Sequence, residues 1–499
     1  MTSRSPASHT SMPAKPSNAR VGAALLVAAL LGSAGCSLAP KYQRPAAPVA
    51  ESYPEATGPI SPAVELSWQQ FFGGDARLRA IIALALENNR DLHAAALNVE
   101  RVRALYRIQR AATFPDIAAT GDGTRRQTPA SLSPTGERSI DSTYQVGLSI
   151  PAYELDFFGR VASLRDTALQ QYLATEQAHR SAHIALISAV ARQYLNLLAT
   201  EERLDLAQQI LAAAERSYAL NHQSFEAGIA SEIDLRTAEA QREAVRASVA
   251  EIEQARDLAY NALVLLVGAP LPATLPAAGT LASQEALIED LPAGLPSELL
   301  TRRPDILAAE HNLRAANANI GAARAAFFPS VRLTAFGGSA SPELSDLFEG
   351  GTKAWTFAPS IALPIFAGGR NRAQLDVAKL AQRIEITNYE KAIQTAFREV
   401  ADALAVAKTI GTQVDAQAAR VTAATRRYEL SQARYRAGVD SYLAVLLAQQ
   451  ELFTAQQQLV AARLARLSNL TGLYAALGGG WDDSSETPAQ TAARLSAAR

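Results

Sequence analysis

Two histidines, His179 and His183, are the first candidates for metal chemistry in this chain of 499 residues. They stand four residues apart, so on a helix both imidazoles would lie on one face, where they could bind a metal ion. No Glu follows His179, and no third ligand stands at the spacing of a known motif. We therefore prefer the other interpretation, in which the two histidines lie on a solvated helix face.

Glu154 and Asp156 form a second constellation, because two nearby carboxylates can act in general acid–base catalysis. They stand where a predicted strand passes into a helix, so Asp156 is better explained as supporting the start of that helix. The segment 350–353, Gly-Gly-Thr-Lys, has the wrong order and spacing for a phosphate-binding loop. The residues thus predict a protein that is not an enzyme and that carries no cofactor and no metal.

The composition excludes further classes of protein. Lys and Arg total 47 and Asp and Glu total 48, so no basic excess is available to neutralise the phosphates of a nucleic acid. A single Cys permits neither an intramolecular disulfide nor a CxxC zinc site. The longest apolar run, Val21–Leu31, is too short for a helix that spans a bilayer, which excludes a helical transporter.

The amino terminus has the layout of a bacterial lipoprotein signal. Basic residues precede the apolar run Val21–Leu31, and small residues then lead to Cys36. We predict a signal peptide over 1–35 and lipidation with palmitate at Cys36, although Ser33 stands where such signals usually carry Leu. The alternative is an ordinary signal peptide with a chance Cys. Ser37 favours the outer membrane, and the proline-rich segment 37–63 is predicted to be an extended tether.

The remainder of the chain is a tandem duplication. A shift of 210 residues matches the sequence to itself without a gap, pairing Arg216, Tyr218, Leu220, Gly228 and Ser231 with Arg426, Tyr428, Leu430, Gly438 and Ser441. A shift of 214 matches 91–115 to 305–329. Two long series of matches at nearly one offset indicate a repeated unit.

Each repeat contains a long helical hairpin. Proline is absent from 152–269 and from 365–487, and apolar residues recur every seven positions, a pattern typical of coiled-coil packing. Both heptad series stop at a glycine, Gly228 or Gly438, and a serine that can cap the next helix follows, Ser231 or Ser441. The sequence therefore predicts hairpins over 160–267 and 369–477.

The two arms of each hairpin are unequal, and a shorter helix makes up the difference. At 1.5 Å per residue the arm 160–227 would be about 100 Å long, while 229–267 would reach only about 58 Å. The helix predicted at 90–112 adds about 35 Å, and 305–327 does the same in the second repeat. We expect each long helix to lie beside two shorter ones stacked end to end, forming a rod.

Four segments alternate between apolar and small or polar residues, at about 116–126, 142–153, 330–340 and 355–365. Their length of about ten residues fits transmembrane β-strands, although two soluble hairpins would show the same periodicity. Four strands cannot close a barrel, and lipid forbids an open edge. If the strands span a membrane, the protein must oligomerise.

The chain resembles the TolC-type outer-membrane efflux channels, in particular their lipoprotein branch typified by NodT and OprM. The resemblance covers nearly the whole chain from Gly35 and rests on several motifs: Gly35–Pro40, Tyr42–Pro45, Trp68–Phe72, Tyr153–Arg160, Arg302–Ile306, Ile320–Pro329, Tyr435–Val439 and Ala476–Trp481. It implies a mixed α and β membrane protein, a homotrimer with a 12-stranded barrel and a periplasmic barrel of 12 helices.

The resemblance also implies an organisation of the chain. The lipidated tether and an equatorial segment would occupy 36–89. The first repeat would cover 90–267 and the second 304–477, with further equatorial segments at 268–303 and 478–499. The implied partners are a periplasmic adaptor protein, an inner-membrane pump of the resistance-nodulation-division class and the lipid of a Gram-negative outer membrane.

The hairpin turns are the candidate functional residues. Gly228 and Gly438 are expected at the periplasmic tips, where a residue with φ > 0 is needed. Their neighbours would contact the adaptor, namely Ala227, Ile229, Ala437, Val439 and Ser441.

The resting channel is expected to narrow near the same tips. In the family an acidic residue commonly lies nine positions after the second turn glycine, but Leu447 stands there, so a charged ring that binds cations is not expected. Leu443 matches an apolar gate position and shares a helix face with Leu447, which predicts a hydrophobic constriction. The alternative is that both leucines pack between helices. Asp234 matches a position that helps to lock the closed state, with Tyr435 as its partner.

Together these features predict the outer-membrane channel of a tripartite efflux system, a passive conduit for drugs or other small molecules. The alternative function is a lipid-anchored periplasmic coiled-coil scaffold without a pore.

Overall fold

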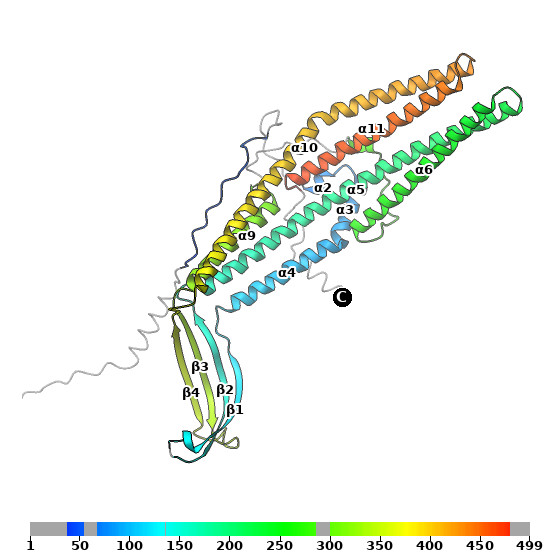
Figure 1. The fold of residues 1–499 in the computed structure, drawn as a ribbon. Helices are drawn as coiled ribbons and strands as arrows, with labels where there is room; N and C mark the ends of the chain where they lie inside the picture. Colours follow the sequence, from blue (N-terminus) through cyan, green and yellow to red (C-terminus); the bar gives the residue numbers. More distant parts are fainter. Residues whose placement is uncertain (1–36, 54–66, 135, 286–299, 480–499) are drawn as a thin grey trace, which may run out of the picture. The chain divides into compact units, whose positions relative to one another are not determined.

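The fold is that of a computed structural model, which describes residues 37–53, 67–134, 136–285 and 300–479 (Figure 1). The predicted signal peptide at 1–35, Cys36 and most of the expected tail at 478–499 lie outside the described residues. The chain divides into two compact units. One is drawn from Met1–Gln43, Leu105–Leu169 and Arg314–Arg383, and the other from Arg44–Ala104, Gln170–Leu313 and Ile384–Arg499.

The first unit contains one antiparallel sheet of four strands. They are β1 (Ala118–Thr128), β2 (Ser139–Leu155), β3 (Ser330–Ser341) and β4 (Lys353–Ala362), hydrogen-bonded in the order β1-β2-β3-β4. A short 3-10 helix at Ala130–Leu132 lies between β1 and β2. The strands follow the four alternating segments of the sequence, but β1 lies two residues later than expected, β2 is longer, and β4 lies two to three residues earlier. The two strand pairs come from different repeats, and β2 and β3 join them.

Long helices make up most of the rest of the chain. The two hairpins are α5 (Arg160–Glu226) with α6 (Glu232–Val267), and α10 (Arg370–Arg436) with α11 (Tyr442–Ala476). The shorter α4 (Arg90–Ala111) and α9 (Pro304–Ala325) precede β1 and β3. Three small helices complete the described elements, α2 (Trp68–Phe71), α3 (Ala76–Asn88) and α7 (Leu281–Glu285). Both α5 and α10 have 67 residues, so the duplication is also present in the lengths of the helices.

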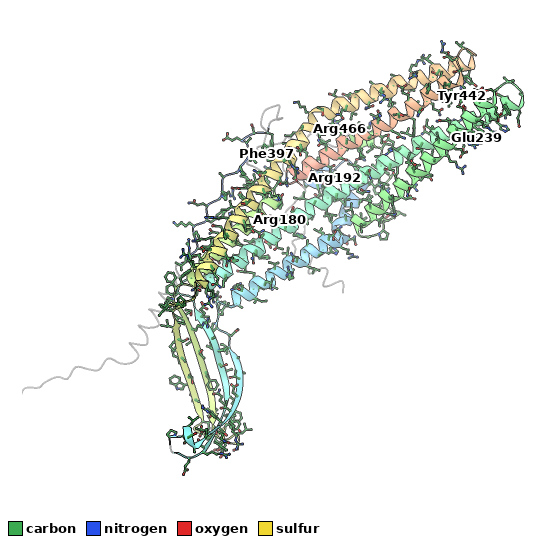
Figure 2. The ribbon with its side chains drawn as sticks, viewed as in Figure 1. Arg180, Arg192, Glu239, Phe397, Tyr442 and Arg466 are labelled. Carbon is green, nitrogen blue, oxygen red and sulfur yellow. The ribbon has the colours of Figure 1, made fainter. Side chains whose placement is uncertain are left out.

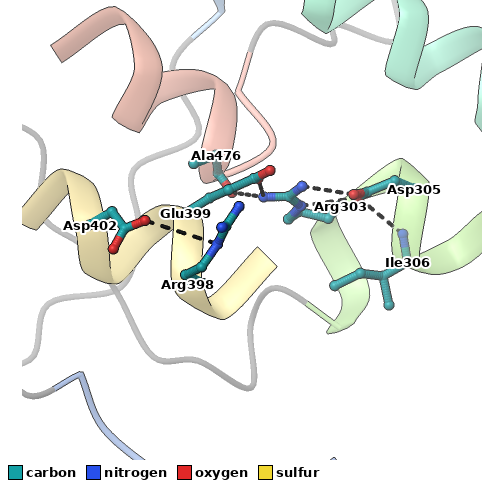
Figure 3. Close-up of polar contacts among 7 residues, drawn as sticks. All are labelled: Arg303, Asp305, Ile306, Arg398, Glu399, Asp402 and Ala476. Carbon is teal, nitrogen blue, oxygen red and sulfur yellow. Dashed lines mark hydrogen bonds and ion pairs between the residues drawn. The ribbon is translucent and has the colours of Figure 1, made fainter. Parts of the chain in front are cut away.

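In each repeat the short helix meets the hairpin end to end, as the lengths predicted. Asn89, just before α4, donates a hydrogen bond of 2.8 Å from Nδ2 to the carbonyl of Leu266, near the end of α6. Arg303 occupies the equivalent place before α9 and donates to the carbonyl of Ala476, the last residue of α11, at 3.0 Å (Figure 3). These two contacts join α4 to α6 and α9 to α11 at their ends.

The end-to-end contact of α9 with α11, which we call the joint, contains a charged cluster around Arg303. Arg303 makes two hydrogen bonds to the carboxylate of Asp305, of 3.0 and 2.7 Å, and one of 2.7 Å to Glu399 on α10. Its side chain is only 9% exposed. Burial lowers the pKa of Arg303, but the bonds to Asp305 and Glu399 raise it above its ordinary value, so the guanidinium stays charged. Arg303 thus fastens three helices of the second unit together.

Among the described residues, the largest hydrophobic core lies in the second unit, where α2 and α3 pack with α5, α6 and α11. Phe71 and Tyr474 stack there with ring centroids 4.1 Å apart. The heptad residues Val190, Leu197 and Leu204 of α5 are buried. Nearer the turn, Phe225 of the same series is exposed, so packing within one chain weakens toward the hairpin tip.

The histidine prediction was wrong. His179 and His183 are buried on α5 rather than solvated. Burial lowers the pKa of both imidazoles, that of His183 to about 4, so both are neutral at pH 7. Among the described residues, no three His, Cys, Asp or Glu side chains are grouped so that they could hold a metal ion. Within the same ranges, no helix is both long and apolar enough to cross a bilayer.

Candidate functional site

The first hairpin tip is a compact turn built on Gly228, whose φ is +71°. The amide of Ile229 donates to the carbonyl of Ser224 at 2.8 Å, and the amide of Gly228 donates to the carbonyl of Phe225 at 2.9 Å. This pair of bonds is a Schellman motif, which needs a left-handed residue where the glycine stands. A Cβ on Gly228 would meet no atom within 4 Å, so the backbone angle alone selects glycine here.

Helix α6 then begins with a reciprocal cap. The hydroxyl of Ser231 accepts a hydrogen bond from the amide of Asp234 at 3.2 Å, and the carboxylate of Asp234 accepts from the amide of Ser231 at 3.3 Å. The Ser231 hydroxyl also donates to this carboxylate at 2.7 Å. Asp234 is therefore a capping residue within its own chain. Its expected pairing with Tyr435 stays a prediction.

The second tip has the same turn, but a different side-chain interaction stabilises it. The amide of Val439 donates a hydrogen bond of 3.0 Å to the backbone carbonyl of Arg434, and Gly438 has a φ of +69°. Ser441 stands at the start of α11, yet its side chain makes no capping bond, contrary to our expectation. Instead Arg434 forms a two-bond ion pair with Asp440, at 2.6 and 3.0 Å, which lowers the pKa of that carboxyl.

Apolar side chains project from both tips. Ile229 is 83% exposed and Val439 61%, and both stand directly after the turn glycine. Ile233, which is also exposed, lies 210 positions before Leu443 and so occupies the same place in the first tip. Sequence reasoning missed Ile233, although the repeat offset would have identified it. Exposed apolar groups at a turn are typical of a surface that binds another protein.

The two predicted gate residues lie on the outside of the single chain. Leu443 is 58% exposed and Leu447 is 50% exposed, whereas Val445, Leu446 and Ala448 between and beside them are buried. The two leucines therefore do not pack between helices of their own chain. They form an apolar face of α11 that begins one residue after the helix starts.

Aromatic residues fix this end of α11 against its neighbours. The Tyr442 hydroxyl shares a hydrogen bond with Ser217 on α5, and the centroid of its ring lies 5.5 Å from that of Tyr435 on α10. Figure 2 labels Tyr442 near the tip of the second hairpin. Burial raises the pKa of Tyr442, so it is a neutral phenol. Sequence analysis identified Tyr435 but not Tyr442 or Ser217, because the contact joins the two repeats.

The sheet has two different faces. Cross-strand partners share a face, so the register places Leu148, Trp355, Phe357 and Ile361 on one side, and all four are exposed. The opposite side carries polar residues from every strand, including Asp122, Gln145, Glu154, Arg332 and Ser360, with Phe336 as an apolar exception. A sheet with one apolar and one polar face suits a wall between lipid and water.

The carboxylates beside the sheet have structural roles. Asp156 accepts a hydrogen bond of 2.7 Å from the amide of Ala162 in the first turn of α5, which confirms that it supports the helix start. Glu154 forms a two-bond ion pair with Arg160, at 2.7 and 2.6 Å. Because each carboxylate is bound to its own partner, the two are not arranged as an acid–base pair.

Comparison with known proteins identifies the family. The model of the outer membrane efflux protein family matches residues 81–269 and 295–479, which is most of the chain. The chain belongs to the outer membrane efflux protein family. It is thereby an outer-membrane channel protein of efflux systems, with a helical periplasmic part and a membrane part of β-strands, and the alternative of a scaffold without a pore is set aside.

Relatives in Pseudomonas species cover almost the whole chain. The toluene efflux pump outer membrane protein TtgF of Pseudomonas putida is 50% identical over 93% of this chain and 98% of its own length. The outer membrane protein OprJ of Pseudomonas aeruginosa is 46% identical over 92% of this chain and 96% of its own.

Solved structures agree with this assignment. The open state of the MtrE outer membrane channel of Neisseria gonorrhoeae aligns with a TM-score of 0.82 at 42% identity, covering 91% of this chain and all of that one. The CmeC outer membrane channel of Campylobacter jejuni aligns with a TM-score of 0.82 at 26% identity, covering 93% and 98%.

Proposed function

We propose that three copies of this chain form a passive conduit that carries small molecules from a periplasmic adaptor and an inner-membrane pump across the outer membrane. The observation that carries the proposal is the sheet, which has one exposed apolar face and ends in β1 and β4. In lipid, the free edges of β1 and β4 must find partners. Pairing β1 of one copy with β4 of the next closes a barrel of 12 strands from three sheets of four.

Exposed apolar stripes on the helices support assembly from several copies. Val377, Leu380 and Ile384 of α10 are exposed at spacings of three and four residues. On α6, Leu258 and Leu265 are exposed seven residues apart. Such stripes match the seams that helices bury against neighbouring helices. In the trimer, two hairpins from each copy would supply the 12 helices of the periplasmic tunnel.

Crosslinking of the sheet edges tests the trimer. A cysteine series along β1, combined with a single cysteine on β4 in a Cys36→Ser background, should yield covalent dimers and trimers at one register. The same series combined with a cysteine on β3, which is already paired on both sides, is the matched control and should yield none. Crosslinks in the control alone, or in neither set, would contradict closure through the edges.

The exposed tips support a docking role toward the adaptor. Ile229 and Val439 lie on the two turns and are held in place by the Schellman bonds. Cysteines at these positions should crosslink to the hairpin tips of the adaptor protein. Crosslinks that arise only from 268–303 would place the contact at the equatorial segment instead.

The same tips support a hydrophobic constriction. Leu443 and Leu447 face away from the core of their own chain, and three copies could direct six leucines toward a common axis. An apolar constriction closes by excluding water. The pump of the resistance-nodulation-division class would supply the energy, and the transported compounds would be apolar solvents or antibiotics like those in the names of the relatives.

The lipid anchor belongs to the same proposal. Cys36 follows the signal-like segment and lies outside the described residues. Wild-type protein should incorporate radiolabelled palmitate, and a Cys36→Ser variant should not. Label that persists in the variant would show that acylation occurs elsewhere.

A further inference from the structure

The segment that follows Cys36 is not a free tether. Residues 37–44 lie against α9 and run in the direction opposite to the helix, as their successive contacts show. The carbonyl of Leu38 accepts a hydrogen bond of 2.9 Å from Arg324 Nη1, and the carbonyl of Pro40 accepts one of 2.8 Å from Asn317 Nδ2. We call the segment Ser37–Arg44 the strap.

Two further contacts continue the series toward the start of α9. The Arg314 guanidinium lies over the ring of Tyr42, 5.0 Å from its centroid. Arg44 then forms a two-bond ion pair with Glu310, at 3.0 and 2.7 Å, and the side chain of Glu310 is only 3% exposed. A buried carboxylate of this kind needs its cation, so Arg44 fixes the far end of the strap.

On α9, Gly321 leaves room for the backbone of the strap. A Cβ on Gly321 would lie 2.8 Å from the amide nitrogen of Ala39, 3.0 Å from its Cβ and 2.5 Å from the Ser163 hydroxyl. Gly321 is helical and has no positive φ, so the close approach of the strap backbone on one side and of Ser163 of α5 on the other explains this glycine. Gln382 of α10 donates a hydrogen bond of 2.8 Å from Nε2 to Oδ1 of Asn317, and so orients the amide group that binds the strap.

The contact residues of α9 form one stripe, with spacings of four, three, four and three residues from Glu310 to Arg324. Side chains at these spacings share one face of a helix. The equivalent stripe on α4, 214 positions earlier, consists of Ala96, Glu100, Arg103, Arg107 and Arg110. It has no glycine and no amide, and Ala96 stands in the place of Glu310. Its one carboxylate, Glu100, stands where α9 has Arg314 and pairs with Arg103 of its own helix at 3.5 Å. The strap site is therefore specific to the second repeat.

We propose that the strap is a docking peptide that fixes where the acylated amino terminus enters the membrane. Leu38 is bonded to Arg324, one residue before α9 ends, and β3 starts at Ser330. Position 36 is two residues further, at most about 7 Å along the chain. The acyl chains are thereby held at the level where the strands begin. The position of the acyl chains rests on the proposed lipidation of Cys36, whereas the docking of the strap on α9 does not.

Trypsin tests the docking. Lys41 is exposed within the strap, and the bond after it is the site to follow by mass spectrometry of the folded trimer. Gly321→Leu should increase the rate of this cleavage at least tenfold. Gly472→Ala on α11, where a Cβ meets nothing within 4 Å, is the control for substitution of a helical glycine away from the strap and should leave the rate unchanged. Equal rates in the parent and in Gly321→Leu would overturn the docked strap.

A second measurement separates docking from lipidation. A Cys36→Ser chain, exported through an ordinary cleavable signal and carrying a benzophenone amino acid at position 37, should still resist cleavage after Lys41. It should also crosslink to phospholipid on illumination, and Gly321→Leu should reduce this labelling severalfold. Protection without lipid labelling would overturn the placement at the membrane. If the parent protein fails to incorporate palmitate, the lipidation of Cys36 is contradicted, but the docking of the strap is not.

Discussion

Replacement of Arg303 by Met should destabilise the protein measurably, because it removes the guanidinium that joins α9, α10 and α11 but keeps an apolar stem. Removal of one partner of a buried ion pair costs about 3 to 5 kcal/mol. Asp305 and Glu399 are 37% and 41% exposed and can regain water, so we reduce the expected loss to about 2 to 3 kcal/mol. For a unit of this size, such a loss should lower the apparent melting temperature of the trimer in detergent by about 3 to 5 °C.

A matched control lies next to it. Arg398 pairs with Asp402 on the same helix as Glu399, but the pair is 3.9 Å apart and both side chains are more than two-thirds exposed (Figure 3). Arg398→Met should change the melting temperature by less than about 1 °C. Arg303→Lys keeps the charge but loses the planar fork, so it should fall between the two. If Arg303→Met melts like Arg398→Met, the joint does not hold these helices together.

Further predictions concern the tips and a buried histidine. Leu443→Ser combined with Leu447→Ser should raise single-channel conductance and admit vancomycin into cells; unchanged conductance in a folded trimer would remove both residues from the gate. The pKa of His183 in the folded chain, about 4, lies below the unfolded value of 6.5, so the unfolded state binds more protons between these values and stability is lost as pH falls through this window. His183→Asn should reduce the drop in melting temperature between pH 7 and pH 5, and an identical drop would contradict neutral burial. Gly438→Ala should destabilise the turn by about 1 kcal/mol and speed hydrogen exchange at the tip, because φ is +69°. Gly411→Ala, inside α10 with open space around its Cβ, should have no such effect.

The helices and strands could be predicted because their signals are local. Long windows without proline, heptad spacing and a glycine at each turn define the hairpins, and alternation defines the strands. The histidine error was avoidable, since His183 lies seven residues before Val190 and so continues the buried heptad series. The two capping serines were also distinguishable. Ser231 has an acidic residue three positions later, whereas Ser441 has Ala444.

Contacts between distant segments could not be predicted in the same way. The joint at Arg303 brings together residues from three helices, and the strap pairs residues nearly 290 positions apart. Neither leaves a periodic signal in the sequence. The repeats could have directed attention to both sites, because Arg303 replaces Asn89 and Gly321 replaces Arg107 at an offset of 214.

Conductance of the purified protein in a planar lipid bilayer tests the central claim most directly. A passive conduit should insert as a trimer and conduct ions without nucleotide or a proton gradient, in steps of uniform size, and the Leu443→Ser, Leu447→Ser variant should give larger steps. A folded trimer that inserts into the bilayer but conducts nothing in either form would contradict the account.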